Sequence, residues 1–225
     1  MLELPGGVQV VDRGEWLKVL LKNLPRERLY GNKKLAGIEN RSNHSYVLHF
    51  EDGSTHEADA VIGCDGLYSK VRQKVLGPER QHLWNPVFAG YWDARGRTTA
   101  ARAAEMFGAE LFDPRAAKEL AFAADGAFLL FQPTDNKETY HVIISCPADS
   151  DFDKTSWKTQ LTREYLEKFG EKWDEKFRLG VIESLMAEDS GPGVVFSQWE
   201  SPETPTYCRD RLCVLGDAAH ATTPA

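Results

Sequence analysis

Two short segments, far apart in the sequence, each run from apolar residues into a glycine and an aspartate. They are AVIGCDG, residues 60–66, and RLCVLGD, residues 211–217. Unbroken apolar runs of this length predict strands that are buried on both faces. A helix start follows each turn, so the sequence predicts two strand–turn–helix units, as an α/β sheet contains.

The turn after the first strand has the features of a ligand-binding loop. Gly63 and Gly66 carry no Cβ, so a ligand can approach their backbone closely. Ser69 is placed to cap the next helix, whose free N–H groups and positive dipole end suit a phosphate. Asp65 is placed to accept hydrogen bonds from ribose or ribityl hydroxyls. The alternative is an ordinary glycine turn with a solvated aspartate, and this loop alone favours neither.

The turn after the second strand is weaker evidence by itself. Gly216 makes a tight turn, and Asp217 lies at a helix N-terminus. A negative charge is favourable at that position with or without a ligand. His220, in the same short helix, is interpreted as a surface residue.

The composition excludes several classes of protein. The 225 residues carry a net charge of −7 and the isoelectric point is near 5.4, which argues against sequence-independent binding of nucleic acid. No apolar run approaches the roughly 20 residues of a membrane span, and residues 1–16 do not have the pattern of a signal peptide. We therefore expect a soluble, cytoplasmic protein with no membrane segment and no nucleic-acid partner.

Further elements are predicted from the spacing of apolar residues. Residues 12–24 have the pattern of an amphipathic helix that begins at Asp12, and Asp52-Gly53 marks a hairpin turn. The hairpin strands are residues 46–50 and 55–59. The middle of the chain predicts an antiparallel strand pair, two helices and a further strand, in that order: residues 126–133, 139–146, 155–170, 175–188 and 193–201.

These elements predict an α/β fold with an insertion. The expected parts are an incomplete doubly wound domain, made of residues 1–80 and 206–225, and an inserted α+β lobe, residues 81–205. The sequence shows neither an internal repeat nor a low-complexity stretch.

Taken together, the two loops resemble those of a known enzyme family. The pattern strand-Gly-x-Asp-Gly-x-x-Ser-x-x-Arg, followed far downstream by strand-Gly-Asp-Ala-Ala-His-x-x-x-Pro, is similar to the FAD-dependent aromatic monooxygenases of the p-hydroxybenzoate hydroxylase type. The stretch GDAAHATTP looks most like the salicylate hydroxylase-like branch, which is common in fungi. The helix that contains Arg13, the hairpin and the middle lobe follow in the order that the family has.

The resemblance implies a fold, a cofactor and a reaction. In the family a doubly wound FAD-binding domain and a substrate-binding sheet hold the isoalloxazine ring between them. NAD(P)H reduces the flavin, O₂ adds to form a C4a-hydroperoxide, and one oxygen is transferred to an electron-rich ring. The implied substrate is a small, salicylate-like aromatic compound, and the implied protein role is to position it and exclude water.

The resemblance also implies cofactor-binding residues in the second loop. Asp217 matches the acid that hydrogen-bonds the ribityl chain of FAD. Gly216 and Ala218 match small residues that let the cofactor lie against the backbone. Pro224 matches a proline beside the flavin ring.

Four more residues match family positions elsewhere. Asp65 and Gly66 match a fingerprint that the family uses for FAD and, indirectly, for the nicotinamide cofactor. Arg13 matches an arginine that approaches FAD, and Leu35 matches an apolar residue near the adenine. The last two matches rest on looser patterns.

No catalytic acid or base is identified by the sequence. Tyr140 and His141 lie on a predicted strand of the middle lobe, where packing is the favoured interpretation and contact with substrate is the alternative. His44, His49 and His56 accompany no cysteine or carboxylate cluster, so we interpret them as surface residues and predict no metal site.

The sequence departs from the family at both ends. No strand-G-x-G-x-x-G-helix unit is present, and the sequence stops one residue after Pro224. We therefore expect a central piece of a larger enzyme, which by itself binds FAD weakly or not at all. The alternatives are a non-catalytic remnant that binds an aromatic ligand or a partner without flavin, and a different Rossmann-like oxidoreductase with chance matches.

Overall fold

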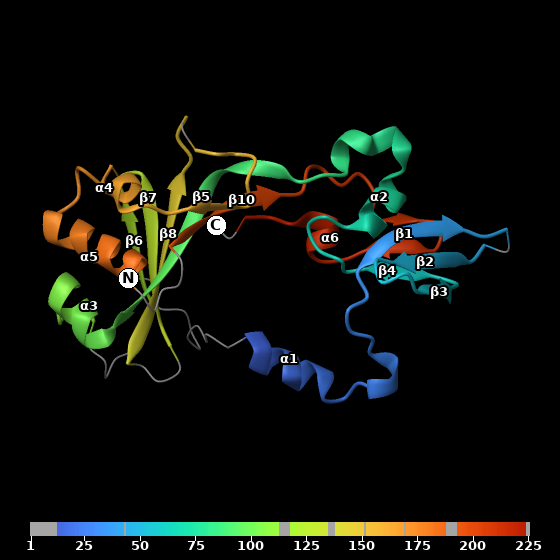
Figure 1. Cartoon of the computed structure of the whole chain (residues 1–225), viewed down its shortest axis with the longest axis horizontal. Helices are drawn as coiled ribbons and strands as arrows, with labels where there is room; N and C mark the ends of the chain where they lie inside the picture. Colours follow the sequence, from blue (N-terminus) through green and yellow to red (C-terminus); the bar gives the residue numbers. More distant parts are fainter. Residues whose placement is uncertain are drawn as a thin grey trace. The chain divides into compact units, whose positions relative to one another are not determined.

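A computed structural model describes residues 13–42, 44–112, 118–134, 138–150, 152–168, 170–187 and 193–223 (Figure 1). The chain divides into two compact units. The first unit contains Leu20–Ala89 and Trp199–Ala225, and the second contains Met1–Val19 and Gly90–Gln198. The two units are considered separately below.

The first unit contains a three-stranded sheet in the order β11-β12-β4. Strand β4, Val61–Gly63, lies parallel to β12, Leu212–Val214, and β11, Cys208–Arg209, forms an antiparallel hairpin with β12. Both predicted strands are confirmed. The prediction that the first is buried on both faces is wrong, because Ile62 has 64% of its surface exposed.

A second sheet of the first unit is an antiparallel meander. It consists of β1, Leu35–Asn40, β2, Tyr46–Phe50, and β3, Thr55–Ala58. The predicted hairpin is confirmed as β2 and β3, and Gly53 takes the positive φ of 82° that its turn requires. Strand β1 was not predicted, because its sequence LAGIEN has little apolar alternation.

Helix α2, Lys70–Leu76, covers the small sheet and carries much of the first unit's core. It begins where the sequence predicts, because the Ser69 hydroxyl oxygen accepts from the backbone N–H of Arg72. Gly77 ends the helix with φ 74°. Shorter helices are η1, Arg26–Arg28, η2, Pro78–Leu83, and α6, Asp217–His220. The buried core cluster joins α2 to both sheets and to α6: Tyr46, Val71, Val75, Leu212, Val214, Ala218 and Ala219.

Helix α1, Arg13–Leu21, confirms most of the helix predicted for residues 12–24, and the boundary between the units falls inside it. Asp12, its predicted cap, lies outside the described residues. The spacing of apolar residues predicts a buried face, yet Trp16 and Leu20 are each 54% exposed. The periodicity therefore identifies a helix correctly without identifying what covers it.

The second unit is a six-stranded sheet with helices gathered on one side (Figure 1). The helices are α3, Ala100–Phe107, α4, Arg163–Glu167, and α5, Glu175–Met186. The sheet order is β6-β7-β8-β5-β10-β9, with these bounds: Leu120–Ala124, Ala127–Pro133, Thr139–Pro147, Val87–Thr99, Val194–Glu200 and Lys158–Gln160. The predicted strand pair is confirmed as β7 and β8, which lie antiparallel.

Two predictions for the second unit differ from the structure. Residues 155–170 were predicted as one helix, but they form β9 and the short α4. The thirteen-residue strand β5 was not predicted. Gly96 in β5 lies so close to the backbone of Ser184 in α5 that a Cβ would collide with it, which explains a glycine inside a strand.

Candidate functional site

The two predicted loops follow neighbouring strands. Strands β4 and β12 pair in parallel, with Val214 opposite Gly63, and the N–H of Leu215 donates to the carbonyl oxygen of Gly63 at 2.9 Å. Parallel strands bring their carboxyl ends to the same sheet edge, and ligands of open α/β sheets bind at that edge. The expectation that Asp65 and Asp217 follow neighbouring strands is therefore confirmed.

The Asp65 carboxylate is bound to the start of α2. Its Oδ2 accepts hydrogen bonds from the backbone N–H groups of Lys70, at 2.7 Å, and Val71, at 3.3 Å, and its Oδ1 accepts from the Ser69 hydroxyl. The Ser69 oxygen in turn accepts from the N–H of Arg72 at 2.8 Å. The interpretation that this helix offers free N–H groups to a phosphate is therefore wrong, because Asp65 and Ser69 already satisfy them.

The two glycines of the first loop have different roles. A Cβ on Gly63 would collide with the side chain of Val71, so this glycine makes room for α2 and not for a ligand. Gly66 has φ 78° and open space where a Cβ would lie. Gly66 is thus required by the backbone conformation and leaves the loop open on that side.

The second loop presents one exposed acid. Gly216 has φ 58° and ψ −140°, with no atom within 4 Å of a built Cβ, and Asp217 is the exposed first residue of α6. Ala218 is fully buried in the core of the first unit, so its small side chain is needed for packing. Pro224 lies outside the described residues.

Arg72 connects these loops through a buried guanidinium that is only 1% exposed. Its Nη1 donates to the carbonyl oxygen of Ala219 at 2.8 Å and to the Thr204 hydroxyl at 2.7 Å. Further bonds reach the carbonyl oxygens of Leu83, Pro202 and Glu203. Burial lowers the pKa of Arg72. The sequence pattern contains this arginine, yet it was not proposed as a site residue.

Arg13 and Leu35, which match the family on less specific sequence patterns, lie in different elements. Arg13 is the exposed first residue of α1. Leu35 begins β1, is half-buried and packs against the core cluster of the first unit. Neither placement tests a role in cofactor binding.

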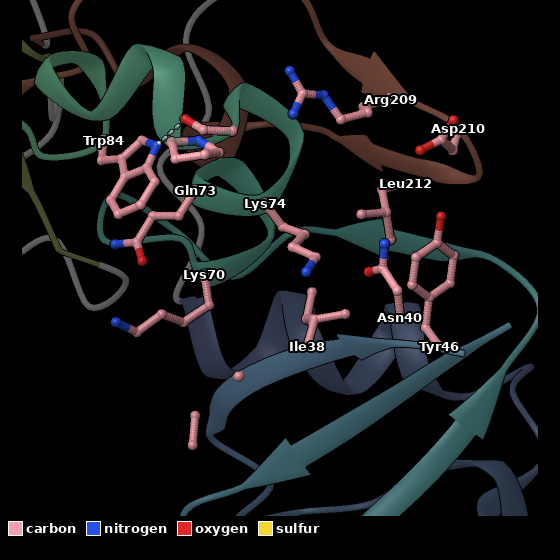
Figure 2. Close-up of a pocket in the computed structure, with 14 residues that line it drawn as sticks. Ile38, Asn40, Tyr46, Lys70, Gln73, Lys74, Trp84, Arg209, Asp210 and Leu212 are labelled. Carbon is pink, nitrogen blue, oxygen red and sulfur yellow. Dashed lines mark hydrogen bonds between the residues drawn. The ribbon is translucent and has the colours of Figure 1, made fainter. Parts of the chain in front are cut away.

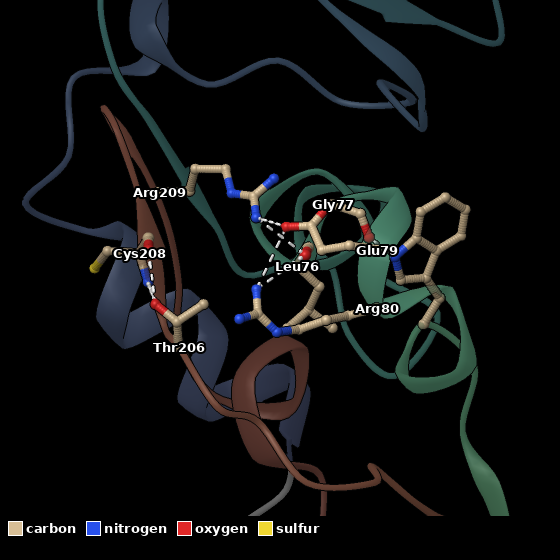
Figure 3. Close-up of polar contacts among 8 residues, drawn as sticks. Leu76, Gly77, Glu79, Arg80, Thr206, Cys208 and Arg209 are labelled. Carbon is tan, nitrogen blue, oxygen red and sulfur yellow. Dashed lines mark hydrogen bonds and ion pairs between the residues drawn. The ribbon is translucent and has the colours of Figure 1, made fainter.

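A cavity of about 510 Å³ lies beside α2 in the first unit (Figure 2). Lys70, Lys74 and Arg209 contribute positive charge to its lining, together with the indole of Trp84, whose Nε1 donates to the Gly77 carbonyl at 3.0 Å. Arg209 is also paired with Glu79 (Figure 3). Neither Asp65 nor Asp217 lines this cavity, so it is separate from the predicted site.

The second unit has a hollow of about 390 Å³ on its sheet. It is lined by Arg95 and Arg97 of β5, His141 and Ile143 of β8, and Gln132 of β7. Burial, followed by the charges of Arg97 and Arg95, lowers the pKa of His141. Tyr140 is fully buried and packs edge-on against Phe112, at 5.3 Å between ring centroids. Of the two candidates, Tyr140 is thus a packing residue and His141 lines the hollow.

The same sheet contains a buried carboxylate that no sequence pattern identified. Asp93 is 3% exposed, and its oxygens accept from the Ser145 hydroxyl at 2.6 Å and from Gln198 Nε2 at 2.9 Å. Burial raises the pKa of Asp93. An isolated aspartate in a strand carries no sequence signal that distinguishes a buried hydrogen-bonded acid from an exposed one.

The described residues contain no group of three or more histidine, cysteine or acidic side chains arranged to hold a metal ion. His44 and His56 are exposed, and His49 lies 3.4 Å from the Glu39 carboxylate. None of the helices described is long and apolar enough to cross a membrane.

Comparison with curated proteins identifies relatives along nearly the whole chain. The chain is 32% identical over 219 residues to the FAD-dependent monooxygenase eupB of Phoma sp. It is 30% identical over 221 residues to the 6-methylsalicylate 1-monooxygenase atA of Aspergillus terreus. Each comparison covers 97% of this chain and 47% of the relative, so the chain spans about half the length of the curated relatives it matches.

Comparison with solved structures and with family models gives the fold and the family. A salicylate hydroxylase in a substrate complex has a TM-score of 0.75 at 21% identity, covering 94% of this chain and 51% of that one. HpxO of Klebsiella pneumoniae, complexed with FAD and uric acid, has a TM-score of 0.67 at 19% identity, covering 95% and 49%. The expected α/β, FAD-binding fold class is confirmed. Because the FAD binding domain model matches residues 30–225, the chain belongs to that family.

Proposed function

We propose that the protein carrying this chain is an FAD-dependent monooxygenase that hydroxylates a salicylate-like aromatic compound. The observation that carries the proposal is the parallel pairing of β4 with β12, which brings the Asp65 and Asp217 loops to one sheet edge. The family match and the names of two relatives, 6-methylsalicylate 1-monooxygenase and salicylate hydroxylase, support the reaction class.

Asp217 is the residue best placed to hold FAD. Its carboxylate is exposed and has no hydrogen-bond or ion-pair partner within the described part of the chain, and the space beside Gly216 is open. These features fit a ribityl hydroxyl that donates to Asp217 while the cofactor lies along Gly216, with the buried Ala218 packed behind it. Asp65 and Gly66 form the adjoining loop, and Pro224 and Leu35 complete the proposed set.

When bound, FAD supplies the redox chemistry: reduction by NAD(P)H, reaction with O₂ and oxygen transfer through the C4a-hydroperoxide. The chain's own contribution is binding. We assign FAD binding to residues 1–80 and 206–225, and substrate binding to residues 81–205. NADH and NADPH are both compatible with this assignment.

The hollow of the second unit fits an aromatic acid. Arg95 and Arg97 line it, and guanidinium groups pair with carboxylates in a fixed geometry. Burial, and then the charges of Arg97 and Arg95, lowers the pKa of His141, which favours the neutral ring. A neutral imidazole can donate one hydrogen bond to a phenolic hydroxyl or accept one from it. We propose that these three residues bind the acid.

The experiment uses the whole protein that carries this chain, purified and supplied with FAD. We expect NAD(P)H consumption to rise on addition of salicylate, with formation of a hydroxylated product. Asp217→Ala should lose flavin absorbance, whereas a double substitution of Arg95 and Arg97 by alanine should keep the flavin and raise KM for the acid. A flavin-loaded protein that no aromatic acid stimulates would contradict the proposal.

One observation favours a second function. The hollow is built entirely from β5, β7 and β8 of one unit, so acid binding does not require a residue of the Asp217 loop. Two results together would favour a non-catalytic binding protein. Salicylate would bind to Asp217→Ala with the same affinity as to the wild-type protein, and the wild-type protein would never oxidise NAD(P)H.

A further inference from the structure

We propose that Cys208 and Cys213 are a thiol pair that hydrogen peroxide converts into an intramolecular disulfide. Both are free cysteines, and they lie on the hairpin that leads into Gly216 and Asp217. The proposal concerns a modification site and does not depend on the proposed monooxygenase activity.

The strand register places the two cysteines directly opposite each other. Cys208 of β11 pairs with Cys213 of β12, and Arg209 pairs with Leu212. Tyr207 and Val214 form the next pair away from the hairpin turn. This pair is hydrogen-bonded, because the N–H of Val214 donates to the carbonyl oxygen of Tyr207 at 3.0 Å. In an antiparallel ladder, hydrogen-bonded and non-hydrogen-bonded pairs alternate, so the two cysteines form a non-hydrogen-bonded pair.

The backbone of Cys208 supports this register independently. The Thr206 hydroxyl donates to the Cys208 carbonyl oxygen at 2.7 Å and accepts from the Cys208 N–H at 3.3 Å (Figure 3). These peptide groups are therefore engaged away from β12. At a non-hydrogen-bonded position the Cα atoms lie about 4.5 Å apart, which is within the roughly 4.4–6.8 Å that disulfides span.

Both thiols lie on the same face of the hairpin and can be reached. Leu212 and Val214 are buried, so the side chain between them, that of Cys213, lies on the opposite face and is half-buried. Directly opposite residues share a face, and Cys208 is exposed. Peroxide therefore reaches Cys208 first, with Cys213 beside it to resolve the product.

The chemistry balances with peroxide as the only oxidant. The Cys208 thiol gives up its proton, the thiolate attacks one peroxide oxygen, and the O–O bond breaks. The hydroxide that leaves takes up that proton, so a sulfenic acid and one water molecule form. The Cys213 thiol then attacks the sulfenic sulfur, an S–S bond forms, and the hydroxyl leaves as a second water molecule with the thiol proton. Two thiols are oxidised by two electrons, and a dithiol reductant reverses the reaction.

The other two cysteines serve as internal controls. Cys64 is exposed, but it follows β4 two positions beyond Ile62, the partner of Cys213, so it is out of register for a bridge. Cys146 is buried, and burial raises the pKa of its thiol to about 12. A thiol of that pKa carries almost no thiolate and reacts slowly with peroxide.

The experiment is oxidation of the purified chain with hydrogen peroxide, followed by alkylation, trypsin digestion and mass spectrometry. Arg209 and Arg211 lie between the two cysteines, so trypsin separates them into peptides that only a disulfide joins. We expect that joined pair in peroxide-treated protein, its loss after dithiothreitol, and continued alkylation of Cys64.

Variants make the result decisive. Cys208→Ser and Cys213→Ser should each abolish the joined peptides, and Cys64→Ser should keep them. Circular dichroism before treatment confirms that each variant is folded. A bridge between Cys64 and Cys213, or full alkylation of both Cys208 and Cys213 after peroxide, would overturn the proposal.

Discussion

Arg72 donates a hydrogen bond of 2.8 Å to the carbonyl oxygen of Ala219, a residue 147 positions further along the chain. Ala219 belongs to α6, which begins at Asp217, and Arg72 belongs to α2, whose first N–H groups are bound by Asp65. One buried guanidinium therefore fixes the two candidate loops relative to each other within the first unit.

Replacement of Arg72 tests this connection. Arg72→Ala removes the five hydrogen bonds of a guanidinium that is only 1% exposed, and we expect the free energy of unfolding to fall on the order of 3 kcal/mol. Arg72→Lys should recover only part of that loss, because an ammonium group does not reproduce the guanidinium fork. Urea unfolding measures both variants. Arg163→Ala, which removes an exposed pair with Glu167, is the matched control and should change stability by less than about 1 kcal/mol.

Gly63→Ala tests the close packing of β4 on α2. The added methyl group would collide with Val71, and overpacking of this kind destabilises by roughly 1–3 kcal/mol. Val71→Gly in the same chain removes the Cβ and both Cγ atoms that the added methyl group would meet, so the double variant should be more stable than the two losses added together predict. Gly37→Ala is the control, because nothing lies within 4 Å of its built Cβ. Simple additivity in the double variant would argue against the contact.

Substitutions of the two acids should separate a structural role from a cofactor role. Asp65→Ala removes the acceptor of two α2 N–H groups and should lower stability by about 1 kcal/mol. Asp217→Ala should leave the urea midpoint nearly unchanged, because Asp217 has no partner within the described residues, and should weaken FAD binding in the whole protein. Flavin titration and urea unfolding of both variants are the measurements. Equal effects on stability would contradict the assignment.

Some features of the candidate site could be predicted from the sequence, and others could not. Gly63, Asp65 and Ser69 form a recognisable pattern because each meets a local steric or capping need. The two apolar runs predict strands β4 and β12, but the register in which they pair comes from the structure. The sequence does not reveal that Asp65 already satisfies the α2 N-terminus, since a capping acid and a ligand-binding acid have the same spacing. Strand β5 was not predicted because Arg95, Gly96 and Arg97 leave no apolar side chain in that part of the strand. Only the packing of α5 on Gly96 explains the glycine.

The pH dependence of stability should report the environment of His141. Burial and the charges of Arg97 and Arg95 lower its pKa in the folded protein below the ordinary value near 6.5. The unfolded chain therefore binds the proton more readily, and this contribution to stability is lost as the pH falls below about 6.5. Between about pH 7.5 and 5.5, the Tm of His141→Gln should therefore fall by less than the Tm of the wild-type protein. His56→Gln, at an exposed position, should behave as wild type; parallel curves for all three proteins would refute the expectation.

The chain by itself should bind FAD weakly or not at all. Within the described residues β4 pairs only with β12, so the other edge of β4 presents unpaired N–H and C=O groups, and Ile62 beside it is 64% exposed. An edge of this kind can be completed by another strand, and the strand-G-x-G-x-x-G-helix unit of the family begins with such a strand. Purified protein should therefore be colourless, and added FAD should elute apart from it in gel filtration. Extending the chain with a strand-G-x-G-x-x-G-helix segment should restore flavin absorbance, and a stoichiometric yellow protein without that segment would contradict the prediction.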